Sequence, residues 1–305
     1  MSDMRSELRW VPELWRAYWF SPASPTGLGI CRILFYGYLL LMSSSLQSAA
    51  WSRVPEAFWL PTPTFEILGL AVPSPVRAGA MDVAWKISLG LACVGLATRA
   101  SAATAFILGF YLLGLPQNFG KVDHWSGLLV VVLGILAFAR AGGALSMDSY
   151  IRRRLRGREP LEFSGEYRWP IRMVWLAMTW VFFAAGVSKL RHGGLEWLSA
   201  ENFRLILLSH YYQIDRDLPA LGLYISEIAW LCSALATATV LLEVGAPMAL
   251  VSRRARLVLV PGLLAFQIAN SLLLGVHARL PFLPCYAFWI PWDRLRSIRE
   301  RSPPS

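Results

Sequence analysis

Long apolar runs separated by short polar segments define the predicted elements of this chain. A helix that crosses a bilayer needs about 20 predominantly apolar residues, with a usual range of roughly 17–25. We expect such spans at Thr26–Leu46, Met81–Ala97, Ser101–Leu115, His124–Ala139, Ile171–Ser188, Leu231–Val251 and Leu257–Leu274, with a shorter candidate at Pro281–Ile290. Amphipathic segments follow at Leu195–Tyr212 and Leu218–Trp230. The predicted fold is all-α: a polytopic helical membrane bundle of seven or eight transmembrane helices plus interfacial amphipathic helices.

The overall composition agrees with this pattern. Hydrophobic residues make up 56% of the 305 residues and the mean hydropathy is +0.47, whereas at most about half of an ordinary soluble domain is apolar. The runs lack the alternation and the ten-residue spacing of outer-membrane strands, which argues against a barrel. We expect one integral membrane domain over residues 1–305.

The net charge of +10 is explained by topology rather than by a nucleic-acid partner. The basic residues lie in short loops, and most of them fall on one side of the membrane if the N-terminus is inside. We therefore expect segments 1–23 and 292–305 in the cytoplasm. A cytoplasmic C-terminus needs an even span count, so Pro281–Ile290 should cross. The cluster Arg152–Arg158 is a topology anchor or, alternatively, an anionic-lipid site.

Cysteine and histidine spacing offers no metal or dithiol chemistry. The four cysteines form no CxxC pair, and the four histidines show neither paired spacing nor an HExxH motif. We therefore expect no metal cofactor and no dithiol redox centre.

A few ionisable residues fall within or beside the apolar runs, where each charge is costly and needs a reason. They are Arg32, Lys86, His124, Lys189, Glu227 and Glu243. Arg32 and Glu243 lie at similar depth in the inner half of their spans, which predicts a structural ion pair. A functional relay and the absence of contact are the alternatives.

His124 and Lys189 fall at the outer ends of the fourth and fifth spans. Consecutive helices are often neighbours, so both side chains could line one outward-facing pocket. A lysine in an apolar site can act as a base near neutrality. The alternative is a lysine that extends to the membrane surface beside an interfacial histidine. The segment Leu195–Tyr212 either packs simply or covers the opening, and we expect Trp125, Trp197 and Tyr211 to contact a lipid-soluble substrate there.

Four stretches resemble one known family. They are Ser21–Ser24 (SPAS) with Ile30–Phe35 (ICRILF), Asp123–Ser126 (DHWS), Ala144–Asp148 (ALSMD) and Ala185–Leu190 (AGVSKL). In this order they resemble vitamin K-dependent γ-carboxylases and their bacterial relatives, the HTTM-domain proteins. The resemblance spans most of the chain.

The resemblance implies a chemistry. The family lysine, matched by Lys189, is held to be the base that deprotonates a reduced, vitamin K-like quinone, and a carbanion on glutamate then adds carbon dioxide. His124 would orient the quinone or stabilise its negative charge. Two departures affect the substrate. Gln267 stands where the family has a late histidine, and we expect no equivalent of the lumenal domain that grips the substrate peptide in animal carboxylases.

Two functional hypotheses follow. The first is a membrane enzyme that acts through Lys189 on a quinone-like or lipidic ligand at the periplasmic face, with a separate peptide-binding protein as a possible partner. The second is a non-catalytic membrane module that binds lipid or a partner protein. Convergence of His124 and Lys189 on one cavity would favour the enzyme.

Overall fold

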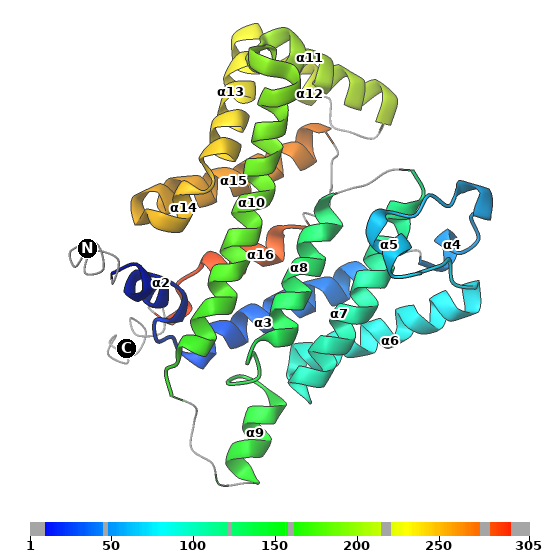
Figure 1. Ribbon diagram of the computed structural model, residues 1–305. Coiled ribbons are helices and arrows are strands. Elements are labelled where there is room, and N and C mark those ends of the chain that lie inside the picture. Colours follow the sequence, from blue (N-terminus) through cyan, green and yellow to red (C-terminus); the bar gives the residue numbers. More distant parts are fainter. Residues whose placement is uncertain are drawn as a thin grey trace, which may run out of the picture. The chain divides into compact units, whose positions relative to one another are not determined.

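The structure is a computed structural model that describes residues 10–44, 48–120, 124–155, 157, 162–214, 221–274 and 281–293. The regular elements within these residues are all helices, apart from one isolated antiparallel bridge between Ala23 and Ser164. The chain divides into two compact units (Figure 1). Unit 1 holds residues 1–174 and 287–305, and unit 2 holds residues 175–286. The expectation of one membrane domain over residues 1–305 stays a prediction.

Unit 1 is built from a series of helices that pack in chain order. Its longer helices are α2 (Trp10–Phe20), α3 (Pro25–Ser43), α6 (Pro75–Val94), α7 (Thr98–Gly114), α8 (His124–Phe138) and α9 (Met147–Arg154). Short pieces join them: α4 (Ser48–Trp51), η1 (Glu56–Phe58), α5 (Pro63–Ile67), η2 (Leu115–Asn118), η3 (Gly165–Tyr167) and η6 (Ala287–Trp289). Helix α3 packs on α6, α6 on α7 and α7 on α8.

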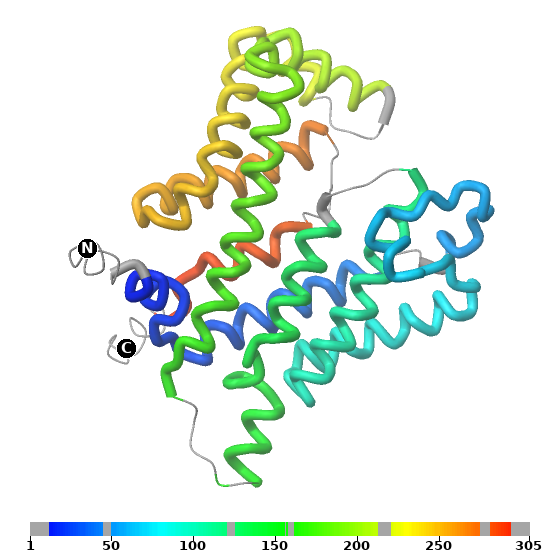
Figure 2. The backbone as a smooth tube through the Cα atoms, in the orientation of Figure 1, coloured from blue at the N-terminus to red at the C-terminus, as the bar shows by residue number. Residues whose placement is uncertain are grey.

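Unit 2 begins inside α10 (Arg168–Gly193), whose first residues belong to unit 1. It continues through η4 (Gly194–Leu198), α11 (Ala200–Ser209), η5 (His210–Ile214), α12 (Leu221–Ser226), α13 (Ala229–Gly245), α14 (Met248–Val251), α15 (Arg253–Leu274) and α16 (Leu283–Tyr286). Figure 2 shows α10 and α13 running side by side. Helix α13 also packs against α11 and α15.

The apolar runs locate the long helices well. Within the described residues, four helical stretches are long and apolar enough to cross a membrane: Pro25–Ser43, Thr98–Asn118, Gly165–Leu198 and Arg253–Leu274. Two shorter apolar helices cover Ser126–Phe138 and Ala229–Gly245. The total of seven or eight spans stays a prediction.

Two predicted spans take a different form in the structure. The sixth, predicted over Leu231–Val251, ends at Gly245 and resumes as α14 after Pro247, whose missing N–H and fixed φ favour a break there. The last, Pro281–Ile290, forms only the short turns α16 and η6. Neither turn approaches the length of a crossing helix.

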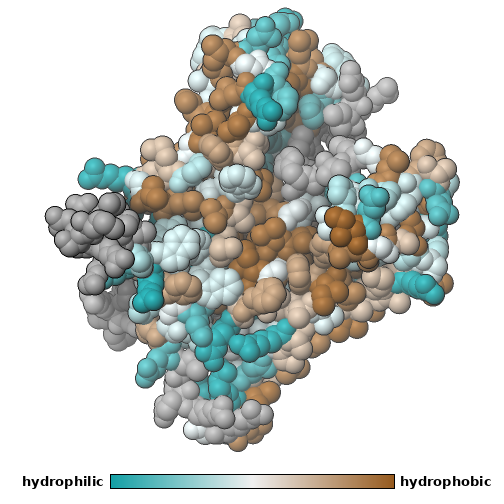
Figure 3. Space-filling model, in the orientation of Figure 1, coloured by the Kyte–Doolittle hydropathy of each residue, from teal (hydrophilic) through white to brown (hydrophobic). Residues whose placement is uncertain are grey.

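The surface is rich in apolar side chains, as a lipid-facing protein requires. Figure 3 shows hydrophobic residues in brown over much of the visible face. Many large ones are strongly exposed, among them Ile67, Val76, Trp180, Trp230 and Val251. Soluble proteins rarely expose large apolar patches to water, so the exposed apolar residues support a membrane environment. The two termini beyond residues 10 and 293 lie outside the described residues.

Candidate functional site

Arg32 is fully buried in unit 1 and is held by backbone carbonyls. Its Nε donates to the carbonyl of Ala141 at 3.1 Å, and Nη2 donates to that of Leu145 at 2.5 Å. Its Nη1 donates to Ala92 and Cys93 at 2.6 Å and 2.5 Å, at the C-terminal end of α6. A cation at a helix C-terminus is favoured by the helix dipole and by the unpaired carbonyls of the last turn. Arg32 therefore ties α3 to α6 and to the 141–145 loop.

The family-like stretch Ala144–Asp148 completes this structural centre. Leu145 adopts the left-handed region with φ 49°, and its carbonyl accepts the bond from Arg32. Gly95 ends α6 with φ 72°, and a Cβ there would lie 2.7 Å from Nη1 of Arg32. Only glycine fits that position, because a side chain would meet both the strained backbone geometry and the guanidinium.

Asp148 supplies the N-terminal cap of α7 from a different helix. Its two carboxylate oxygens accept the backbone N–H groups of Ala97 and Thr98 at 2.9 Å and 2.7 Å, and the Thr98 hydroxyl at 2.7 Å. Partial burial alone would raise the pKa of Asp148, but these bonds and the charge of Arg152 outweigh it and lower the pKa below its ordinary value. The stretch therefore works as a structural clamp.

Lys189 in unit 2 makes a two-pronged ion pair with Glu243. Its Nζ lies 2.6 Å from Oε1 and 2.7 Å from Oε2. The Glu243 side chain is 3% exposed and that of Lys189 is 20% exposed. A buried carboxylate needs such a partner, because an isolated charge away from water would cost several kcal/mol. The pair links the C-terminal part of α10 to the last turn of α13.

Gly186 explains why the two helices approach each other here. A Cβ on Gly186 would lie 2.8 Å from Cβ of Glu243 and 3.0 Å from the backbone nitrogen of Val244. Both distances are shorter than ordinary contacts, so a larger residue would push α13 away from α10. The glycine lies one helical turn before Lys189 and places its amine within reach of the carboxylate.

Trp197 lies next to the same amine. The Nζ atom of Lys189 is 5.3 Å from the centre of the Trp197 ring, within range of a cation–π interaction. The ring is carried by η4, and its neighbour Leu198 accepts a hydrogen bond from the Ser233 hydroxyl at 2.8 Å. Trp197 therefore lies beside the amine of Lys189, and its contact with a substrate stays a prediction.

The other predicted site residues have different outcomes. Tyr211 packs edge-on against Tyr212, with ring centres 5.2 Å apart, and its role in substrate binding stays a prediction. His124 begins α8 as expected, but its side chain and that of Trp125 lie outside the described residues. His124 belongs to unit 1 and Lys189 to unit 2, so their convergence on one cavity also stays a prediction.

The predicted ion pair between Arg32 and Glu243 is wrong. Arg32 has its donors occupied by carbonyls, and the oxygens of Glu243 are occupied by Lys189. Similar depth along two helices does not make their side chains neighbours, and a guanidinium can be neutralised by carbonyl dipoles without an acid. Gly186 is compatible with a close neighbour on that face of α10, but it does not identify Lys189 as the partner of Glu243.

Comparison with known proteins decides the family. A family model described as the HTTM domain matches residues 20–290. The chain belongs to the HTTM domain family. No curated protein and no solved structure matches it. Within this HTTM protein, the family-like stretches around Arg32 and Asp148 form the structural clamp, and the stretch Ala185–Leu190 carries the ion pair.

Proposed function

We propose that this HTTM protein is a bacterial inner-membrane enzyme in which Lys189 and Glu243 act as an acid–base pair on a quinone-like or lipidic ligand. The observation that carries the proposal is the buried two-pronged pair beside the Trp197 ring. In a purely structural pair the two charges need only neutralise each other. Here the lysine side chain also stays partly exposed, so a ligand can approach it. Ionisable pairs of this kind in apolar surroundings are typical of functional sites.

The residues around Lys189 suit a flat, apolar ligand that carries an oxygen. Two of the three ammonium protons point to Glu243, and in the described part of the chain no hydrogen-bond partner takes the third. That donor and the Trp197 ring offer a polar and an aromatic contact to one ligand. A reduced quinone, when bound, would supply a hydroxyl proton and reducing equivalents.

Proton transfer from Lys189 to Glu243 leaves the net charge of the pair at zero. One ammonium proton of Lys189 moves along the 2.6 Å bond to Oε1 of Glu243, which leaves a neutral amine and a neutral acid. The amine can then take a proton from a ligand hydroxyl. The pair holds one extra positive charge until a proton leaves through the exposed side of Lys189.

Orientation, partners and the final reaction are part of the same proposal. The N-terminus and C-terminus lie in the cytoplasm, and the site opens at the periplasmic face. His124 stabilises negative charge on the ligand, and a carboxylation step would use a separate peptide-binding protein.

Cysteine labelling at two exposed positions, Glu162 and Glu56, tests the orientation. A cysteine at Glu162 should resist an impermeant thiol reagent in intact cells and one at Glu56 should react; the reverse pattern contradicts the orientation.

Ligand retention tests the proposal directly. Quinones are extracted from the purified full-length protein and quantified by mass spectrometry for the wild type, Lys189→Ala and Lys86→Ala. Lys86 is the matched control, because it also pairs with an acid, Asp82, at 2.6 Å on an apolar helix. We expect quinone with the wild type and Lys86→Ala but not with Lys189→Ala. Equal retention by all three proteins would favour a non-catalytic module over an enzyme that acts through Lys189.

A further inference from the structure

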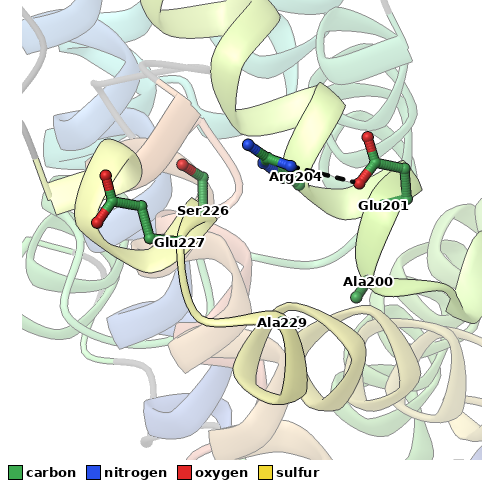
Figure 4. A pocket seen from close by; sticks show the side chains of 6 residues that line it. All are labelled: Ala200, Glu201, Arg204, Ser226, Glu227 and Ala229. Carbon is green, nitrogen blue, oxygen red and sulfur yellow. Dashed lines mark ion pairs between the residues drawn. The ribbon is translucent and has the colours of Figure 1, made fainter.

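A polar pocket lies in unit 2, where the first turn of α11 faces the turn between α12 and α13. It has a volume of about 310 Å³ and is lined by Ala200, Glu201, Arg204, Ser226, Glu227 and Ala229. Figure 4 shows Glu201 and Arg204 on one wall and Ser226 and Glu227 on the other. The site described above uses none of these residues.

Glu227 needs an explanation of its own. It is exposed and lies between the apolar helix α12 and the apolar helix α13. Among the residues that the structure describes, no cation forms an ion pair with it. A carboxylate at the edge of apolar surface is costly unless water or a cation meets it. The pocket in front of Glu227 offers space for a cationic group.

The opposite charge is present on the other wall of the pocket. Arg204 lies 3.6 Å from Glu201, and both side chains are at least half exposed. An exposed ion pair of this length contributes little, so a ligand can replace it at small cost. Helix α13 begins at Ala229 without a side-chain cap, and its N-terminal dipole favours a negative group at the same pocket.

Exposed apolar residues are chain neighbours of the residues that line the pocket. Tyr224 is 69% exposed, Trp230 is 73% exposed and Ile228 is also exposed. These residues flank Ser226, Glu227 and Ala229 along the chain. Aromatic residues beside charged groups are typical of the membrane–water boundary, where acyl chains can cover them while the headgroup stays polar.

We propose that this pocket binds a phospholipid headgroup that carries both a primary ammonium and a phosphate, the chemistry of phosphatidylethanolamine. The ammonium donates hydrogen bonds to Glu227. The phosphate accepts from Arg204 and lies at the start of α13, where guanidinium and backbone N–H groups suit its oxygens. The acyl chains run over Tyr224 and Trp230. A choline headgroup fits less well, because its quaternary ammonium has no N–H to donate.

Native mass spectrometry of the full chain in detergent tests the lipid class. The probes are short-chain phosphatidylethanolamine, phosphatidylcholine and phosphatidylglycerol, with free phosphoethanolamine as a fourth arm. We expect phosphatidylethanolamine to bind about tenfold more tightly than either other lipid, because each of them loses a charge-assisted contact. Binding of free phosphoethanolamine as tight as that of the lipid would assign the pocket to a soluble ligand. Equal binding of the three lipids would overturn the proposal.

Variants test whether these residues form the site. Glu227→Gln and Arg204→Gln should each weaken phosphatidylethanolamine binding about tenfold. The controls are Glu66→Gln and Arg99→Gln, two exposed residues of unit 1, which should leave binding unchanged. Melting curves confirm that each variant is folded, and the comparison of lipids on the wild type stands without them. Binding by Glu227→Gln equal to that by Glu66→Gln would contradict the assignment.

Discussion

The amine of Lys189 and the carboxylate of Glu243 form a close, two-pronged pair at 2.6 Å and 2.7 Å, with the carboxylate side chain 3% exposed. Gly186 allows the approach, since its missing side chain leaves room for Cβ of Glu243. The pair therefore has two roles, because it neutralises a buried acid and holds a titratable amine beside Trp197. Stability and activity measurements can separate these roles.

Removing one partner of this pair should be more damaging than removing both. Glu243→Leu or Lys189→Met alone leaves an uncompensated charge in an apolar site, which costs about 3–5 kcal/mol. The double variant should recover most of that loss, since apolar groups of similar size replace both charges. Thermal unfolding in detergent, followed by circular dichroism, measures the three proteins.

The control for this comparison is Lys86→Met, whose pair with Asp82 lies within one helix and leaves the lysine side chain 35% exposed. A pair between residues four apart on one helix is worth only about 0.3–0.5 kcal/mol. A double variant as unstable as either single variant would show that an uncompensated buried charge does not cause the loss of stability in the single variants.

Gly186→Ala should destabilise unit 2. The added Cβ would lie 2.8 Å from Cβ of Glu243 and 3.0 Å from a backbone nitrogen, so the helices must separate at a cost of about 1–3 kcal/mol. Gly90→Ala on α6 is the matched control, because nothing lies within 4 Å of its added Cβ. It should stabilise its helix by roughly 0.5–1 kcal/mol. Equal melting temperatures for the two variants would contradict the close approach.

Arg32→Lys should destabilise unit 1 despite keeping the charge. A lysine ammonium cannot reach the four carbonyls that the planar guanidinium serves. Each lost hydrogen bond from a charged group costs roughly 1.5–3 kcal/mol, so the melting temperature should fall by many degrees. Exposed Arg99→Lys is the control. A loss in Arg32→Lys no larger than in Arg99→Lys would rule out the clamp.

Asp148 should make stability depend on acid pH. Hydrogen bonds from Thr98 and Ala97 lower its pKa in the folded state, although burial opposes them. A group whose folded pKa is depressed contributes stability above its unfolded pKa of about 3.9, and loses it as the pH falls through the folded pKa. The difference in unfolding free energy between wild type and Asp148→Asn should therefore be full near neutrality and shrink below about pH 4. A difference that is constant from pH 7 to pH 3 would contradict the cap.

The sequence predicted the helices better than it predicted the partners of the charged residues. Apolar runs are local, so Thr26–Leu46, Ser101–Leu115 and Ile171–Ser188 each fall on a long helix. The break after Gly245 was not predicted, although Pro247 interrupts the apolar run there. The total number of spans depends on how short apolar helices meet the bilayer, and hydropathy alone does not decide that.

Partners across helices have no comparable local signal. Arg32 binds backbone carbonyls, and every residue offers a carbonyl, so nothing in the sequence marks Ala92 or Ala141 as partners. Lys189 was identified from its place at the end of an apolar run and from its family resemblance. Its pairing with Glu243 depends on the packing of α10 against α13, which Gly186 permits but does not specify.

Oxygen-dependent turnover of a reduced naphthoquinone by Lys189→Arg tests the central claim most directly. The variant is measured in lipid nanodiscs beside the wild type and Lys86→Arg. An arginine can keep the positive charge beside Glu243, but a guanidinium is not deprotonated near neutral pH. The account predicts a folded Lys189→Arg protein whose turnover is lost, while Lys86→Arg works at the wild-type rate. Turnover by Lys189→Arg at the wild-type rate would contradict the acid–base role and leave Lys189 as a structural partner of Glu243.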